Sequence, residues 1–158
     1  MKIFFLTFAV FSLCVLSGYK SHPESIFPDE RLIIRGEESF FEFQQNPQLE
    51  KVFTDIENGL SSGNVNLLSK HFSSQNYLSL SNGISGYYSS NQTYYILQDL
   101  FKISKPVSFR FTGVVANKNP YATGVLTYEH RNRKETAQVF ISLEFSGSEW
   151  TISQLTIR

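Results

Sequence analysis

The chain has 158 residues, of which 41% are hydrophobic and 15% aromatic, enough to form one domain with a sizeable core. Its 14 basic and 14 acidic residues balance to a net charge of zero, and no basic stripe could neutralise a phosphate backbone, so nucleic acid is not expected as a partner. Cys14 is the only cysteine, which excludes an internal disulfide and a thiolate metal site.

The first 18 residues have the pattern of an export signal. Lys2 supplies the positive end, residues 3–16 form an apolar run, and Ser17 offers a small residue for cleavage. The run is too short to span a bilayer comfortably. We therefore expect a signal peptide over residues 1–18 and a periplasmic or secreted protein, with membrane contact only through the signal before cleavage. A retained membrane anchor is the alternative.

Residues 19–45 differ in composition from the rest of the chain. They hold two of the five prolines, and acidic residues outnumber basic ones, as is typical of a linker. The apolar clusters at residues 32–34 and 40–43 do not suit a solvated tether. We expect a linker or an arm packed on the domain, and the alternative is a segment that binds a membrane face or a partner.

Two helices are predicted next. Asn46 and Pro47 suit the cap and first position of a helix, and its apolar stripe is Leu49, Val52, Phe53, Ile56 and Leu60. Gly59 and residues 61–63 should end that helix, and Asn64 should begin a shorter one.

A hairpin and a third helix are predicted to follow. Residues 76–81 alternate between polar and apolar side chains, and the Asn82-Gly83 pair predicts a two-residue turn that places Tyr77 opposite Tyr88. Ser89 or Ser90 should cap a helix that is apolar on most of its circumference and therefore buried between layers.

Four alternating segments, at residues 107–112, 121–130, 136–144 and 150–157, complete the chain and predict an antiparallel meander. The alternation of the last segment changes phase, which indicates a bulge near Ser153-Gln154. The expected fold is α+β, with three N-terminal helices, a small hairpin before the third, and a curved four-stranded antiparallel sheet on which they pack.

This order of elements resembles the nuclear transport factor 2-like superfamily, also called the cystatin-like cone, over residues 46–158. More narrowly, several short motifs resemble an uncharacterised bacterial family, domain of unknown function 4783. These motifs are residues 60–64, Asn82-Gly83, residues 86–89 with Gln92, residues 119–124 and residues 137–139. The resemblance implies one domain over residues 46–158, shaped as a cone whose open end can hold a small apolar ligand. The family has no known catalytic residues to transfer.

Aromatic residues are the candidates to line such a pocket, because ligand pockets are concave and rich in aromatic side chains with a few polar groups. The alternative for each is ordinary core packing. The candidates are Tyr77, Tyr87, Tyr94, Tyr95, Phe109, Tyr128 and His130.

Groups for acid–base catalysis are few. Asp99, His71 and His130 are the candidates, but a solvated or capping role explains each of them. No catalytic residue is therefore assigned. The three histidines have no metal-ligand spacing, and no metal or cofactor is expected.

We therefore expect an exported domain that binds a small apolar ligand or a protein partner without catalysis, with a homodimer through the sheet as one form of partner. Two alternatives stay open. One is a small lyase or isomerase acting in the cone pocket, and the other is a structural or assembly module of the cell envelope.

Overall fold

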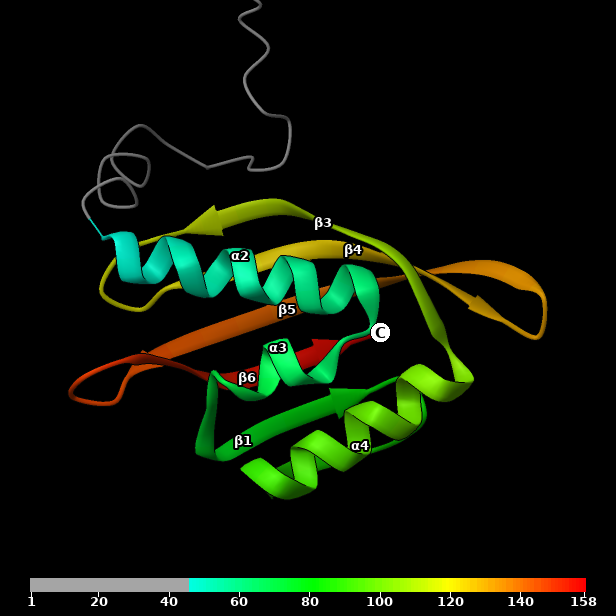
Figure 1. The fold of residues 1–158 in the computed structure, drawn as a ribbon, viewed down its shortest axis with the longest axis horizontal. Coiled ribbons are helices and arrows are strands. Elements are labelled where there is room, and N and C mark those ends of the chain that lie inside the picture. The colour runs from blue at the N-terminus through cyan, green and yellow to red at the C-terminus, as the bar shows by residue number, and fades with distance from the viewer. Residues whose placement is uncertain (1–45) are drawn as a thin grey trace, which may run out of the picture.

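The computed structural model describes residues 46–158 (Figure 1), so the predicted signal peptide at residues 1–18 and the linker or arm at residues 19–45 lie outside the described residues. No helix within residues 46–158 is long and apolar enough to cross a membrane. The elements, in chain order, are α2 (Pro47–Ser62), α3 (Val65–Ser69), β1 (Phe72–Leu80), β2 (Ser85–Ser89), α4 (Ser90–Ile103), β3 (Lys105–Val115), β4 (Tyr121–His130), β5 (Arg133–Phe145) and β6 (Trp150–Ile157).

The predicted four-stranded antiparallel sheet is wrong. All six strands form one mixed sheet in the order β2-β1-β6-β5-β4-β3, in which β1 runs parallel to β6 and the other pairs are antiparallel. The meander of β3 to β6 is present, but the hairpin of β1 and β2 extends the sheet instead of standing apart from it. Pairing with β1 removes an exposed edge at β6, which would otherwise leave its backbone groups open to other chains.

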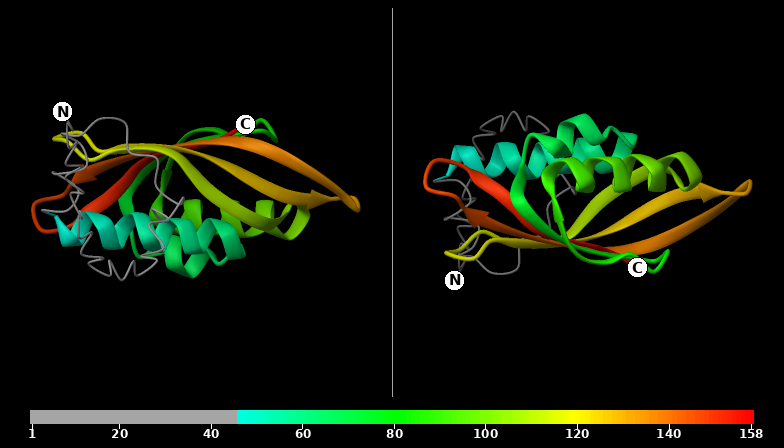
Figure 2. Two further views of the ribbon diagram at one scale, coloured as in Figure 1. Left: turned by 90° about the horizontal axis from the view of Figure 1, so that it is seen from above. Right: turned by 90° about the horizontal axis from the view of Figure 1, so that it is seen from below.

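The helices all lie on one face of the sheet, which bends over them (Figure 2). We call the opposite face of the sheet the outer face. The predicted caps are confirmed: the Asn46 side chain accepts from the Leu49 N–H, and Gly63 ends α2 in the left-handed conformation. However, α2 continues through Gly59 to Ser62. Leu68 of α3 packs so closely on Gly59 that a Cβ there would lie 2.7 Å from the Leu68 Cδ2 atom.

The third predicted helix, α4, is less buried than expected. Ser89 and Gln92 form the capping box at its start, which agrees with the predicted cap. Only Thr93, Leu97, Leu100 and Phe101 are buried, whereas Tyr95 and Ile103 are 63% and 64% exposed. The helix packs beside β1 near the edge of the sheet and nothing described covers its far side, so only one stripe is enclosed.

The space between helices and sheet is filled by side chains. Phe53 of α2 meets Phe111 of β3 edge to face, with ring centroids 5.7 Å apart, and Phe109 meets Phe111 at 5.0 Å. Gly124 of β4 lies against Phe109, and a Cβ at Gly124 would come 2.5 Å from the Phe109 ring. The α+β cone implied by the resemblance is therefore present, with aromatic rings packed in its interior.

The turn between β1 and β2 differs from the predicted two-residue turn. Gly83 N–H donates to the Leu80 carbonyl and Leu80 N–H to the Ile84 carbonyl, which closes a three-residue loop with Gly83 at a φ of 91°. This loop shifts the register by one residue, and Tyr77 lies opposite Tyr87 rather than the predicted Tyr88. Because side chains alternate along a strand, the shift puts the Tyr77 and Tyr87 rings on the same face of the sheet.

Candidate functional site

A large bulge interrupts the pairing of β1 with β6. The ladder passes from Phe72 opposite Ile152 to Tyr77 opposite Gln154, so residues 73–76 stand opposite Ser153 alone. Asn76 holds the bulge: its Oδ1 accepts from the Ser73 N–H and its Nδ2 donates to the Ser73 carbonyl, both at 3.0 Å. Asn76 is 0% exposed, so it satisfies two backbone groups of a buried segment.

A second irregularity coincides with the first. In the ladder between β5 and β6, Leu143 pairs with Ile152 and Ser142 with Gln154, which leaves Ser153 as an extra residue. The Ser153 hydroxyl donates to the Ser142 carbonyl at 3.2 Å. The bulge predicted near Ser153-Gln154 is thus confirmed. Bulges bend strands and redirect side chains, and here two of them meet at one point of the sheet.

Two tyrosines stand beside this point. The Tyr77 and Tyr87 rings lie edge to face with centroids 5.2 Å apart, and the Tyr77 hydroxyl is 3.2 Å from the Ser85 Oγ. Leu78 and Leu155 point into the core, so their strand neighbours Tyr77 and Gln154 point to the outer face. Tyr87 is 69% exposed, which leaves its ring open to a ligand.

These features surround a hollow of about 630 Å³ on the outer face, within the size range of small-molecule sites. Glu144 is the one charged residue in its lining. We call this hollow the tyrosine groove; it is lined by Ser73, Ser74, Gln75, Tyr77, Tyr87, Glu144, Ser153 and Gln154.

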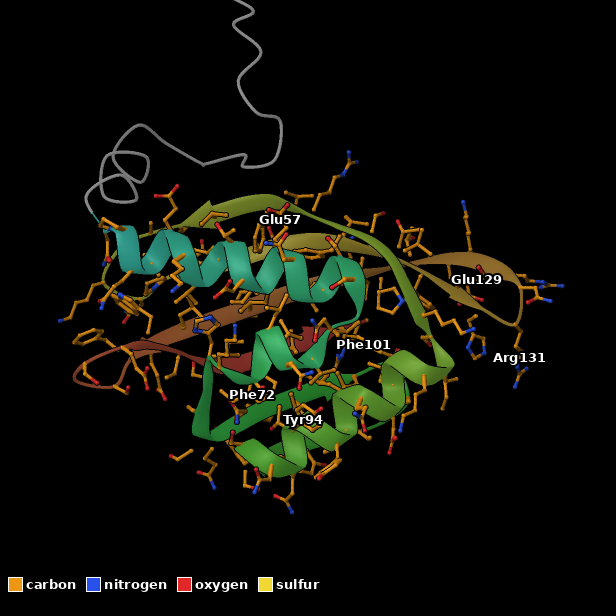
Figure 3. All side chains as sticks on the ribbon, in the orientation of Figure 1. Glu57, Phe72, Tyr94, Phe101, Glu129 and Arg131 are labelled. Atoms are coloured by element: carbon orange, nitrogen blue, oxygen red, sulfur yellow. The ribbon has the colours of Figure 1, made fainter. Side chains whose placement is uncertain are left out.

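Three of the other predicted pocket residues lie elsewhere. Tyr94 of α4 points toward α3 (Figure 3), where its hydroxyl donates to Asn66 Oδ1 at 3.1 Å beside a separate hollow of about 230 Å³. Tyr95 packs edge to face on Tyr94 at 5.3 Å and is otherwise exposed. Phe109 is 5% exposed and belongs to the core.

The remaining two, Tyr128 and His130, lie near the end of the β4–β5 hairpin, where Figure 3 labels Glu129 and Arg131. Burial, together with the hydrogen bond to Glu135 and the charge of that carboxylate, raises the pKa of Tyr128; its hydroxyl donates to Glu135 Oε2 at 3.0 Å. His130 Nδ1 lies 3.3 Å from the Ile103 carbonyl oxygen. The structure thus brings together Tyr77 and Tyr87, and separates both from the other five candidates.

The candidate acid–base groups are also dispersed. Asp99 is exposed and pairs with Lys102 at 2.8 Å. His71 follows the C-cap of α3, Lys70, and its Nε2 lies 3.0 Å from Asp55 Oδ2 of α2. The sequence carries no local signal for that pair, since it depends on how α2 packs against the start of β1. Within residues 46–158, no group of three His, Cys, Asp or Glu residues is placed to hold a metal ion.

Solved structures of similar fold include two DUF4783 family proteins. The one from Bacteroides uniformis is 16% identical with a TM-score of 0.60, and the match covers 66% of this chain and 93% of that chain. The one from Bacteroides ovatus is 18% identical with a TM-score of 0.58, and the match covers 65% of this chain and 90% of that chain.

A third similar structure is an NTF-2 like protein of unknown function from Shewanella oneidensis. It is 12% identical with a TM-score of 0.53, and the match covers 70% of this chain and 95% of that chain. At such identities these structures show the fold alone. The chain matched no curated protein. A family model described as a domain of unknown function (DUF4783) matches residues 53–158, which is more than half of the chain. The chain therefore belongs to the DUF4783 family, as its sequence motifs and its nuclear transport factor 2-like fold both indicate.

Proposed function

We propose that the protein is an exported, non-catalytic binding module whose ligand is a neutral, polyhydroxylated molecule such as an oligosaccharide, held in the tyrosine groove. One observation carries this proposal: two strand bulges meet at Ser153 and arrange uncharged hydrogen-bonding side chains around a tyrosine pair, of which Tyr87 is exposed and Tyr77 half-buried. The export-signal pattern of residues 1–18 supports the proposed localisation.

The chemistry of the groove suits such a ligand. The exposed Tyr87 ring offers a rigid apolar surface for the C–H face of a sugar ring, with its hydroxyl left for hydrogen bonding. Serine hydroxyls and glutamine amides both donate and accept, which matches the alternating donors and acceptors of sugar hydroxyls. The carboxylate of Glu144 only accepts, and it disfavours an anionic ligand.

The expected apolar ligand inside the cone is less well supported. Phe111 packs against both Phe53 and Phe109 in the space that such a ligand would need. The lyase or isomerase alternative requires a histidine or a buried carboxylate beside a tyrosine hydroxyl. In the tyrosine groove the one carboxylate, Glu144, is exposed, so it is not held in the water-poor setting that tunes a catalytic acid.

A comparison of two exposed tyrosines tests the proposal. Tyr87 is 69% exposed inside the groove, and Tyr95 is 63% exposed on α4 outside it, so the two make a matched pair. On a glycan array, we expect the unaltered protein and Tyr95→Ala to bind the same subset of neutral glycans. Tyr87→Ala should lose about tenfold in affinity, or about 1.4 kcal/mol. Equal retention by both variants, or no binding to any glycan, would overturn the proposal.

A second candidate function is assembly through the outer face of the sheet. Tyr121 of β4 stacks on Phe140 of β5 with centroids 5.8 Å apart and an interplanar angle of 28°, and Tyr121 is 40% exposed. This aromatic pair on an outer face favours a protein partner, of which a second copy of the chain is the simplest. Sedimentation velocity over a range of concentrations tests it, since self-association would raise the apparent mass.

A further inference from the structure

A second hollow, of about 370 Å³, lies on the other side of the sheet from the tyrosine groove, beside the first half of α2. We call it the tryptophan hollow, and it is independent of the proposed glycan site. Three elements meet there: the exposed side of α2, the start of β1, and the turn that leads into β6. Its lining is Gln48, Lys51, Val52, Asp55, Lys70, His71, Glu149 and Trp150.

One wall of this hollow is fixed by a hydrogen-bonded pair. His71 Nε2 lies 3.0 Å from Asp55 Oδ2, and the two side chains are only 13% and 20% exposed. An ionised carboxylate can only accept, so Nε2 carries the proton and the imidazole orientation is set. The backbone of His71 is also held, because its N–H donates to the Leu68 carbonyl and its carbonyl accepts from the Ile152 N–H at 2.6 Å. The wall is therefore formed before any ligand arrives.

Another part of the lining is apolar. Trp150 is half-buried, and its indole lies 5.2 Å from the Phe145 ring, centroid to centroid. Val52 of α2 is 6% exposed and adds an aliphatic surface. A flat hydrophobic body fits against these two side chains, because indole surfaces gain from stacking as well as from burial.

Two lysines stand at the rim of the hollow. Lys51 and Lys70 are exposed, and neither forms an ion pair with any residue between 46 and 158. The carboxylate of Asp55 already accepts from His71, which leaves exposed Glu149 as the one acid not so engaged. Two ammonium groups can donate charge-assisted hydrogen bonds to a carboxylate while its apolar body lies on Trp150.

We propose that the tryptophan hollow binds small aromatic carboxylates, with the ring against Trp150 and Val52 and the carboxylate at Lys51 and Lys70. The chain itself supplies the reporter. Trp150 is the only tryptophan in the sequence, so all of the indole fluorescence of the protein comes from a residue that lines this hollow.

The test is a fluorescence titration of the purified protein with three probes that share one ring and differ in charge: phenylacetate, 2-phenylethanol and 2-phenylethylamine. We expect phenylacetate to bind at least tenfold more tightly than 2-phenylethylamine, with the alcohol between them. Lys51→Met and Lys70→Met should each weaken phenylacetate binding about threefold to tenfold. Lys118→Met, in the exposed β3–β4 loop, is the matched control and should bind as the unaltered protein does.

Three results would overturn the inference. They are no change in Trp150 emission with millimolar phenylacetate, equal affinity for the three probes, and equal losses in the Lys118→Met control and the two rim variants. The lysines are exposed, so none of these variants threatens the fold. The outcome is also separable from the proposed glycan binding, because Tyr87→Ala should leave the phenylacetate titration unchanged.

Discussion

Replacing Asn76 by alanine should destabilise the domain more than replacing an exposed asparagine by alanine. Asn76 is 0% exposed, and its amide satisfies both the N–H and the carbonyl of Ser73 inside the β1 bulge. Alanine would leave both backbone groups without their partner, and an unsatisfied buried group costs about 1–3 kcal/mol. The free energy of unfolding should therefore fall by about 2–5 kcal/mol, and the melting temperature by about 10 °C or more.

Thermal and urea unfolding followed by circular dichroism would measure this loss. Asn117→Ala is the matched control. The Asn117 side chain also accepts a hydrogen bond from a backbone N–H, that of Asn119, but it does so in an exposed loop. We expect the control to lose less than about 1 kcal/mol. A loss at Asn76 no larger than at Asn117 would refute the view that this amide holds the bulge. The Asn76→Ala variant should also lose glycan binding in conditions where it remains folded.

Three further predictions follow from the core, from the pKa of one tyrosine and from the outer face. Gly124→Ala should destabilise the domain by about 1–3 kcal/mol in urea unfolding, since its Cβ would lie 2.5 Å from the Phe109 ring and 2.7 Å from the Arg110 carbonyl oxygen; unchanged stability would mean that both neighbours can move. The folded state raises the pKa of Tyr128 above its usual 10.0, so it retains the phenol proton more strongly than the unfolded chain does. Stability relative to Tyr128→Phe should therefore be constant below about pH 10 and decrease as the pH rises further, and a flat difference in alkaline denaturation curves would contradict this. Tyr121→Ser should shift any concentration-dependent association to lower mass in sedimentation velocity, because Tyr121 provides the exposed ring stacked on Phe140; an unaltered profile would exclude this face as the contact.

Local signals predicted the helices well. Asn46 and Pro47 begin α2, Gly63 ends it, and Ser89 with Gln92 begins α4, because capping depends on hydrogen bonds within a few residues. The phase change in the last strand likewise revealed the bulge at Ser153, since alternation is visible in one strand alone.

The pairing of strands that are distant in the sequence was harder to predict from the sequence. The parallel ladder between β1 and β6 joins segments that are distant in the sequence, and no local pattern specifies which edge of a meander receives another strand. The extra residues of β1 opposite Ser153 could not be predicted from the sequence for the same reason. Asn76, which the alternation places at the start of a strand, is the residue that holds them.

The sequence names Tyr77 and Tyr87 as candidates to line a pocket of the cone, and their role in binding stays a prediction. The structure places both at a hollow on the outer face of the sheet instead. Their meeting depends on Gly83, whose positive φ closes a three-residue loop and shifts the register by one. The Asn82-Gly83 pair suits a two-residue turn equally well, so the sequence could not place both rings on the outer face.

The most direct test of the proposed function is nuclear magnetic resonance mapping of backbone amide shifts with a neutral oligosaccharide selected from the glycan array. We predict shifts confined to residues 73–77, Tyr87, Glu144 and residues 153–154, which need about tenfold more oligosaccharide to saturate in Tyr87→Ala and the same concentration in Tyr95→Ala. Shifts confined to the helix side of the sheet, or shifts that saturate in Tyr87→Ala as they do in the unaltered protein, would contradict the proposed function.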